Sequence, residues 1–417
     1  MDTNNLINLQ AKNFLNWLVG AMLCGAMTVT VFVICIDPYN LYGWFKRDGI
    51  NSVKPDLSRY LEEIKLTQAA NLNPDTLIFG NSRAEIGFDP ESPALIRRGF
   101  SAYNLAIRGT SIALSNRQLD YLLHKGLKPK RLFIAVDFGD FISAGGHSSS
   151  NPQPVTAAIT TDFPVEHWPW HFDSLFSITS IKDAVRTLLI QNDNEAATMT
   201  RRGFNPLREY QAMARNEGYF VLFRQRAEDN AKNYRKKAMG KFDRTDLGYL
   251  RAMLKKAVDV GSEVIVIIYP YHAQLLILFE ELGLLPSFAQ WKNEIVAETE
   301  RFSKLPGAPQ IRVVDFSGYG IRQCEPIPGK DDLRSVTQWY WEAGHFKKAL
   351  GDIVLERALA LAAEPLIAPQ DKSKFGINLS GINLALNSER MADEKNKCAE
   401  TYPQLFKETK ALTEVFH

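Results

Sequence analysis

Two short segments that lie far apart in the sequence contain the residue types of a catalytic serine and its base. In the first, a mostly apolar run over residues 76–79 is followed by a glycine, an asparagine and Ser82. In the second, Glu342 and His345 stand just before a helical segment. A serine hydroxyl is a weak nucleophile that needs an adjacent base. Histidine suits that role because its pKa of about 6.5 lets it take and return a proton, and the nearby Glu342 carboxylate can fix its tautomer.

Each segment also has a structural interpretation without catalysis. Residues 80–82 can simply close a strand in a turn, and a Glu-x-x-His spacing is common on a solvated helix face. Gly344 favours a turn at the second segment. If the first segment is a strand-to-helix turn, Ser82 lies beyond the carboxyl end of a strand, where open α/β sheets bind ligands. The catalytic interpretation therefore requires a fold that brings Ser82 and His345 together.

The elements that must position these residues alternate between short apolar strands and helices. Strands are expected over residues 76–79, 101–106, 131–137, 264–270 and 311–316, with helices between them and a last helix over residues 346–362. This alternation predicts an α/β domain over residues 51–364, in which helices cover both faces of a parallel sheet in a three-layer αβα arrangement with five strands. Residues 145–243 lack the alternation and are expected to be an insertion, and residues 365–417 a polar tail with one helix.

An uncharged apolar stretch over residues 14–36 precedes this domain. A membrane-spanning helix needs about 20 such residues, and Trp17 near one end with Tyr42 and Trp44 beyond the other suits the two interfaces. A cleaved signal peptide is the alternative, but the apolar stretch is long and ends without a small-residue cleavage site. We therefore expect residues 1–45 to form a single-span membrane anchor with a short juxtamembrane segment.

Flanking charges determine the orientation of this anchor poorly. Lys12 precedes the apolar stretch, whereas Lys46 and Arg47 follow it. Because positive residues are enriched on the cytoplasmic side, the count leans slightly towards a cytoplasmic C-terminal domain.

Composition bounds the class of protein further. A chain of 417 residues with 45% hydrophobic residues can form one large domain or two ordinary ones. The net charge of +2 gives no indication of nucleic-acid binding. The four cysteines include no Cys-x-x-Cys pair, which argues against a zinc site. Cys324 and Cys398 can pair if their compartment is oxidising. We expect no metal and no cofactor.

Together, the two segments resemble a known family. Gly80-Asn81-Ser82-Arg83 after the first strand and Glu342-Ala343-Gly344-His345 before the last helix are similar to the first and last sequence blocks of the SGNH (GDSL-like) hydrolase superfamily. The resemblance covers about residues 76–362 and implies an SGNH or flavodoxin-like sheet of five parallel strands. It also implies a serine esterase or acyltransferase that uses a Ser-His-Glu triad.

The resemblance assigns roles residue by residue. Ser82 resembles the nucleophile, and its backbone N–H the first donor to the oxyanion. His345 resembles the base, and Glu342 takes the place usually held by aspartate. Gly109, after the second strand, resembles the glycine whose N–H is a second oxyanion donor. Losing one such donor typically lowers the rate by about 10²–10³.

The chain departs from the family at the end of the third strand, where Asp137 stands in place of the Gly-x-Asn-Asp block. An ionised carboxylate cannot donate to an oxyanion and would repel it. Arg83 can supply positive charge beside the nucleophile, or it can pair with Glu85 or Asp89. His272 follows the fourth strand, where it either contacts substrate or serves a structural role.

Membrane-tethered extracytoplasmic members of the superfamily often serve O-acetylation or acyl editing of cell-surface polysaccharides. By this analogy we expect a single-pass protein of the inner or plasma membrane with a periplasmic C-terminal domain. Its substrate would be an acylated carbohydrate, with envelope proteins as partners. The alternative is a non-catalytic SGNH-like scaffold or glycan-binding protein of an envelope polysaccharide assembly, and Asp137 favours it. The acyl donor, the acceptor and the oligomeric state are left open.

Overall fold

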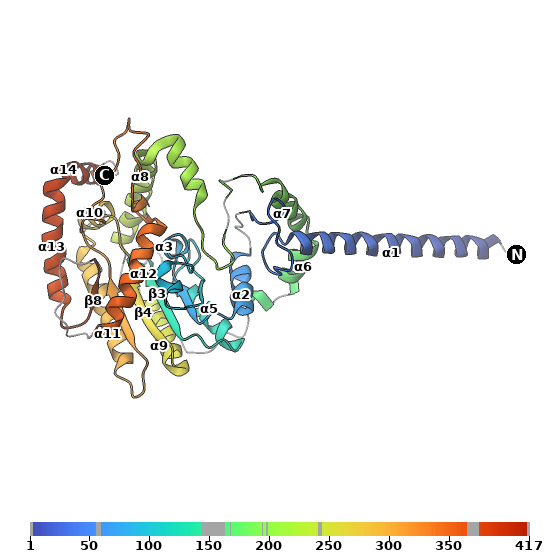
Figure 1. Cartoon of the computed structure of the whole chain (residues 1–417), viewed down its shortest axis with the longest axis horizontal. Helices are drawn as coiled ribbons and strands as arrows, with labels where there is room; N and C mark the ends of the chain where they lie inside the picture. The colour runs from blue at the N-terminus through green and yellow to red at the C-terminus, as the bar shows by residue number, and fades with distance from the viewer. Residues whose placement is uncertain are drawn as a thin grey trace. The chain divides into compact units, whose positions relative to one another are not determined.

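The computed structural model describes residues 3–55, 60–142, 163–166, 168–193, 195–196, 199–240, 244–364 and 375–414 (Figure 1). The chain divides into two compact units. A helical unit contains residues 1–67 and 162–198, and an α/β unit contains residues 68–161 and 199–417. The region expected as one insertion is thus shared, because residues 162–198 belong to the helical unit and residues from 199 onward to the α/β unit.

The helical unit is built on α1 (Thr3–Ile36), the long N-terminal helix in Figure 1. Its segment Gln10–Ile36 has a mean hydropathy of 2.4 and is the one helix among the described residues that is long and apolar enough to cross a membrane. The last turns of α1 pack against α6 (Trp168–Phe176) and α7 (Ile178–Leu189). Val33, Ile36 and Ala184 form the buried centre of this contact.

The α/β unit is organised around a sheet of six described strands. Their order is β2 (Ala102–Asn104), β1 (Thr76–Phe79), β3 (Arg131–Val136), β4 (Glu263–Ile268), β5 (Ile311–Asp315) and β8 (Ile377–Leu379). The first five are parallel, and β8 pairs antiparallel with β5. The mixed α/β class is confirmed, and each of the five predicted strands is present. The prediction of a five-stranded, wholly parallel sheet is wrong, because the three-residue β8 adds an antiparallel edge.

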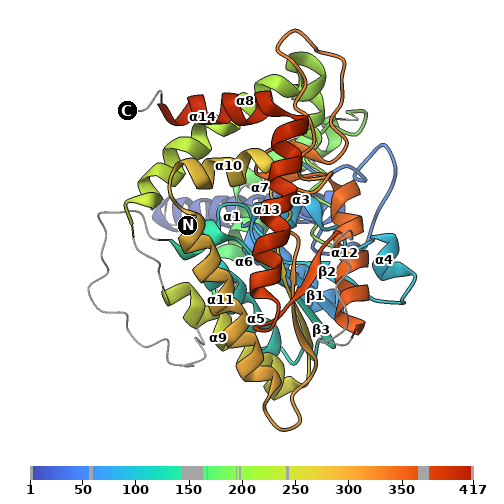
Figure 2. The same ribbon diagram turned by 90° about the vertical axis from the view of Figure 1, so that its left-hand side faces the viewer.

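Helices cover both faces of this sheet, as Figure 2 shows. One face carries α5 (Ile112–His124), α9 (Arg244–Val260) and α11 (Leu285–Ser303), which contact one another. The other carries α3 (Ser82–Gly87), α4 (Pro93–Ile96) and α12 (Lys348–Ala363). This agrees with an αβα arrangement. Further helices are α2 (Leu61–Leu72), α10 (Ala273–Glu281) and two short 3₁₀ turns, η1 (Phe138–Phe141) and η2 (Pro164–Glu166).

Two elements near the carboxyl ends of the strands lie outside the main sheet. A small hairpin pairs β6 (Tyr340–Glu342) with β7 (His345–Phe346). The long helix α8 (Arg208–Ala238) packs against β6 and bends at Gly218, whose φ of +80° and ψ of 161° interrupt the helix. Such backbone angles are almost confined to glycine.

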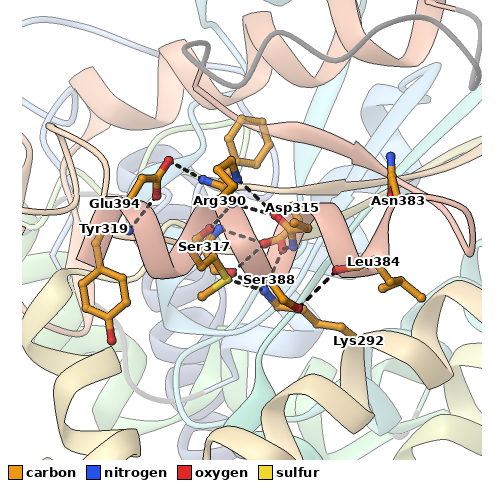
Figure 3. A network of polar contacts seen from close by, with 12 residues as sticks. Lys292, Asp315, Ser317, Tyr319, Asn383, Leu384, Ser388, Arg390 and Glu394 are labelled. Atoms are coloured by element: carbon orange, nitrogen blue, oxygen red, sulfur yellow. Dashed lines mark hydrogen bonds and ion pairs between the residues drawn. The ribbon is translucent and has the colours of Figure 1, made fainter. Parts of the chain in front are cut away.

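The C-terminal residues are docked on the α/β core and are not a peripheral tail with a single helix. After β8 the chain forms α13 (Leu384–Thr401) and α14 (Pro403–Glu414). Figure 3 shows the polar network that holds α13. The buried Asp315 carboxylate accepts hydrogen bonds from Lys292 Nζ at 2.7 Å and Asn387 Nδ2 at 2.8 Å. Arg390 donates to the Ser317 carbonyl at 2.8 Å. A Cys324–Cys398 disulfide joins the same helix to the loop after β5.

Candidate active site

Ser82 lies at the junction between β1 and α3. Gly80 is required there, because a Cβ at this position would meet the Tyr269 hydroxyl and would lie 2.8 Å from Ala84 Cβ. Asn81 caps α3, and its side-chain oxygen accepts a hydrogen bond from the Arg83 N–H at 3.1 Å. Ser82 is therefore the first residue of a helix, half-buried and accessible from outside. Its own N–H has no partner within that helix.

The β6–β7 hairpin brings the histidine to this serine. His345 Nε2 lies 2.8 Å from Ser82 Oγ, which is hydrogen-bonding distance. His345 Nδ1 makes a short hydrogen bond with Glu342 Oε1. The Gly344 N–H donates to the second Glu342 oxygen at 2.6 Å, so the tight turn holds the carboxylate against the imidazole. The structure thus brings together all three residues that the two sequence segments predicted as a triad.

Glu342 is fully buried, and its environment favours the ionised form. Burial alone would raise the pKa of Glu342, but His345 and the Gly344 N–H outweigh it, so the pKa lies below its ordinary value. An ionised carboxylate at this place can orient the imidazole and stabilise its charged form.

Close glycine packing holds α3 against the hairpin. A Cβ at Gly87 would overlap the Phe346 ring of β7, and a Cβ at Gly351 of α12 would overlap the Gly87 carbonyl. Only residues without side chains allow α3 to approach β7 and α12 this closely. The distance between Ser82 and His345 therefore depends on packing that neither sequence segment reveals.

A buried ion pair lies beside the triad. Arg83 Nη1 and Asp137 Oδ2 form a short salt bridge, and their side chains are 10% and 6% exposed. Asp137 also accepts hydrogen bonds from Asn81 Nδ2 at 3.1 Å and the Tyr271 hydroxyl at 2.9 Å. Burial disfavours the charge on Arg83, but Asp137 and the neighbouring tyrosines outweigh it and raise the Arg83 pKa. Of the alternatives that the sequence left open, an ion pair of Arg83 with Glu85 or Asp89 is not observed, because Arg83 pairs with Asp137.

The two carboxylates once considered for Arg83 have other partners. Glu85 Oε2 accepts the backbone N–H of Arg108 at 2.8 Å, and Asp89 lies 3.5 Å from Lys348 Nζ. Arg83 instead extends over the ring of Tyr271, with 5.4 Å between the guanidinium carbon and the ring centroid. The Arg83 charge is thus directed to the end of β3.

Sequence reasoning missed the aromatic residues of this site. Tyr269 and Tyr271 follow β4 directly and are fully buried. The Tyr271 hydroxyl donates to Asp137 and accepts the Phe138 N–H at 3.0 Å. Burial, followed by the charge of Asp137, raises the pKa of Tyr271 well above its ordinary value, so the phenol stays protonated. Their position at the carboxyl end of a strand was the signal that could have identified them.

Gly109 lies in the loop between β2 and α5. Because β1 and β2 are parallel, this loop and Ser82 lie at the same edge of the sheet, where the strands have their carboxyl ends. The Arg108 N–H donates to Glu85 of α3, and the Ile107 N–H lies 3.4 Å from the Gly80 carbonyl. Gly109 is exposed, has a φ of +71°, and its N–H makes no hydrogen bond within the described part of the chain. The loop that carries Gly109 is therefore hydrogen-bonded, through Ile107 and Arg108, to the serine turn and to α3.

His272 is not part of this arrangement. It is fully buried at the start of α10, where Nε2 lies 2.9 Å from the Glu325 carbonyl oxygen and Nδ1 accepts the Gln274 N–H at 3.1 Å. Burial lowers the pKa of His272 to about 4. Because both ring nitrogens have protein partners, the structure favours the structural role for His272 over substrate contact.

The helix α8 forms a wall next to the hairpin. The Tyr219 ring stacks on Trp341 with an interplanar angle of 13°, and Lys347 Nζ lies 4.3 Å from the Tyr219 ring centroid. Arg226 Nη2 donates to the Tyr210 hydroxyl at 2.6 Å. Burial lowers the pKa of Lys347 to about 8. Aromatic and cationic side chains thus surround Trp341, the residue next to Glu342 in β6.

Comparison with known proteins adds no family to this geometry. No family model matches the chain, and no curated protein matches it. Among the described residues, no group of three or more His, Cys, Asp or Glu side chains could hold a metal ion. What the site can do is therefore argued from its own residues.

Proposed function

We propose that this protein is a membrane-tethered serine acyl-ester hydrolase or O-acyltransferase that acts on a cell-envelope or exported glycan. In this proposal it is a divergent member of the SGNH hydrolase superfamily with an SGNH or flavodoxin-like core. The observation that carries the proposal is the hydrogen-bonded chain from Ser82 through His345 to the buried Glu342. A serine nucleophile requires a base in contact with its hydroxyl and a carboxylate that orients the base, and His345 and Glu342 occupy these two positions.

In the proposed reaction the Ser82 oxygen attacks the acyl carbonyl while His345 Nε2 takes the hydroxyl proton. The N–H groups of Ser82 and Gly109 stabilise the oxyanion that develops on the carbonyl oxygen. His345 then protonates the departing alcohol, which leaves an acyl group on Ser82. Water or a sugar hydroxyl gives its proton to His345 and attacks this ester, which releases the acyl product and restores the serine.

The sheet topology supports a site at this place. The order of the five parallel strands is β2-β1-β3-β4-β5, so the direction of the connections reverses between β1 and β3. In open α/β sheets, ligands bind outside the carboxyl ends of the strands at such a reversal. Ser82 follows β1 and Asp137 follows β3. The proposed nucleophile thus lies where this class of sheet binds its ligands.

The disulfide supports an extracytoplasmic position for the α/β unit. Cys324 and Cys398 are joined, while the other two cysteines lie in α1. Structural disulfides persist mainly in oxidising compartments. We therefore retain the proposal of a single-pass protein of the inner or plasma membrane, with its C-terminal unit in the periplasm. The flanking charges of α1 lean the other way but are few.

The non-catalytic alternative depended on Asp137, whose charge would oppose an oxyanion. Asp137 is, however, paired with Arg83 and hydrogen-bonded to Asn81 and Tyr271. This pairing removes the charge conflict that favoured a scaffold, and the catalytic proposal is therefore preferred.

Labelling with a serine-directed fluorophosphonate tests the proposal. We expect the full-length protein in detergent to be labelled at Ser82, with Ser82→Ala abolishing the label and His345→Ala slowing it by about 10²–10⁴. Ser111→Ala is the matched control, because Ser111 caps α5 through the Ala113 N–H and contacts no histidine among the described residues. A folded wild-type protein that stays unlabelled would support the scaffold function instead.

A further inference from the structure

An exposed apolar surface lies on the two helices that pack against the end of α1. We call it the α6–α7 face. On α6, Phe172 and Phe176 are 48% and 41% exposed, and their ring centroids are 5.0 Å apart. On α7, Ile178, Val185 and Leu189 are 74%, 42% and 77% exposed. These three positions are spaced by seven and four residues, so they form one stripe along the helix.

Basic residues border this stripe. Lys182 and Arg186 follow Ile178 at intervals of four residues, and both are exposed. Helical geometry places them beside the stripe and away from the buried Ala184. Asp183 faces another side of α7, where its carboxylate accepts a hydrogen bond from the Tyr39 hydroxyl at 3.0 Å. An apolar stripe bordered by cations is typical of a helix that lies in a membrane interface.

The length of α1 indicates how deep in the membrane the α6–α7 face would lie. The apolar segment Gln10–Ile36 has 27 residues, which at about 1.5 Å per residue corresponds to about 40 Å. The hydrocarbon core of a bilayer is only about 30 Å thick. The final turns of α1, where Val33 and Ile36 contact α7, therefore coincide with the membrane boundary. Trp44, 79% exposed just beyond α1, has the residue type that is enriched at this depth.

We propose that the α6–α7 face is a second membrane contact, which lies flat in the headgroup region of the leaflet where α1 ends. Its apolar side chains enter the boundary between headgroups and acyl chains, and Lys182 and Arg186 contact anionic headgroups. The occupant is a lipid surface, because the face is continuous with the membrane-spanning helix and carries matching charge. This inference depends on α1 as the span and is independent of the proposed catalytic activity.

Fluorescence quenching in nanodiscs tests the inference with the full-length protein. The free cysteines Cys24 and Cys35 lie in α1 and are exposed, so they are replaced by serine, and the environment-sensitive dye NBD is attached at Ile178→Cys or Leu189→Cys. The nanodiscs contain phosphatidylcholine and phosphatidylglycerol, with a nitroxide placed near the headgroup in one preparation and deep in the acyl chain in another. A dye at Lys255→Cys, an exposed position on α9 of the α/β unit, is the control.

We expect the dyes at Ile178→Cys and Leu189→Cys to shift to shorter wavelength and to be quenched most by the shallow nitroxide, with little change at Lys255→Cys. Equal quenching at all three positions, or none, would overturn the inference. In a separate variant that keeps Cys24 and replaces only Cys35 by serine, a dye on Cys24 checks the span itself and should be quenched most by the deep nitroxide. Failure at Cys24 would remove the basis of the inference without bearing on Ser82 labelling.

Discussion

At the scale of single residues, the Arg83–Asp137 pair explains how an aspartate can stand where the resembled family has asparagine. A carboxylate beside an oxyanion site is unfavourable when it is free. Here Arg83, Asn81 and Tyr271 bind both of its oxygens. Because a buried charge without its partner is costly, each member of the pair depends on the other. Asp137 therefore holds Arg83 and Asn81, the two neighbours of Ser82, in place.

Replacing Asp137 tests this dependence. We expect Asp137→Asn to lower the free energy of unfolding by about 3–5 kcal/mol, because the buried Arg83 then loses its salt-bridge partner. We also expect slower fluorophosphonate labelling of Ser82, although the substitution restores the residue type of the family. Chemical denaturation and labelling kinetics of the same protein measure both effects.

A double substitution and a matched control sharpen that experiment. Arg83→Gln combined with Asp137→Asn should recover part of the lost stability, because neither charge then remains unpaired. Asp120→Asn is the matched control. It removes another buried carboxylate, which pairs with Lys256 at 2.6 Å and joins α5 to α9. It should destabilise the fold without slowing the labelling of Ser82. Faster labelling in Asp137→Asn with unchanged stability would show that a third oxyanion donor was missing.

At the scale of elements, the sequence predicts what local patterns determine and misses what tertiary contacts determine. The five parallel strands were predictable because each is an apolar run between helices. β6, β7 and β8 were not predicted, because they lie outside the alternation of strands and helices, whereas the equally short β2 lies within it. The Ser82–His345 contact was expected from the resemblance of the two segments to one family, and the strand pattern alone did not predict it. The Arg83–Asp137 pair was not, because sequence does not reveal which side chains meet across two strand ends.

The bend in α8 is an element-scale feature with a testable cause. Gly218 has a backbone conformation that is almost confined to glycine, and a Cβ there would lie 3.1 Å from Leu333. We expect Gly218→Ala to cost about 1–3 kcal/mol of folding free energy. Because α8 packs on β6, labelling of Ser82 should also slow. Gly329→Ala, at an open position without a left-handed φ, should change neither quantity. If Gly218→Ala and Gly329→Ala unfold at the same temperature, α8 does not need glycine at position 218.

At the scale of the whole molecule, two features bear on which side of the membrane the α/β unit lies: the charges that flank α1 and the Cys324–Cys398 disulfide. The flanking charges of α1 lean towards a cytoplasmic α/β unit, whereas a structural disulfide is typical of an oxidising compartment. The charge difference is small, with Lys12 on one side and Lys46 and Arg47 on the other. The disulfide, by contrast, connects residues 74 positions apart and fastens α13 to the core. We therefore give the disulfide more weight.

Thiol counting separates the two orientations. In protein taken directly from cells and denatured without reductant, we expect a maleimide polymer to modify only Cys24 and Cys35, and to modify all four cysteines after reduction. Four modified thiols before reduction would instead place the unit in a reducing compartment. Replacing Cys324 and Cys398 by serine should cost about 2–5 kcal/mol of folding free energy. The loss should appear first as protease cleavage between α12 and α14, because the Lys292–Asp315–Asn387 network would then hold α13 without its covalent link.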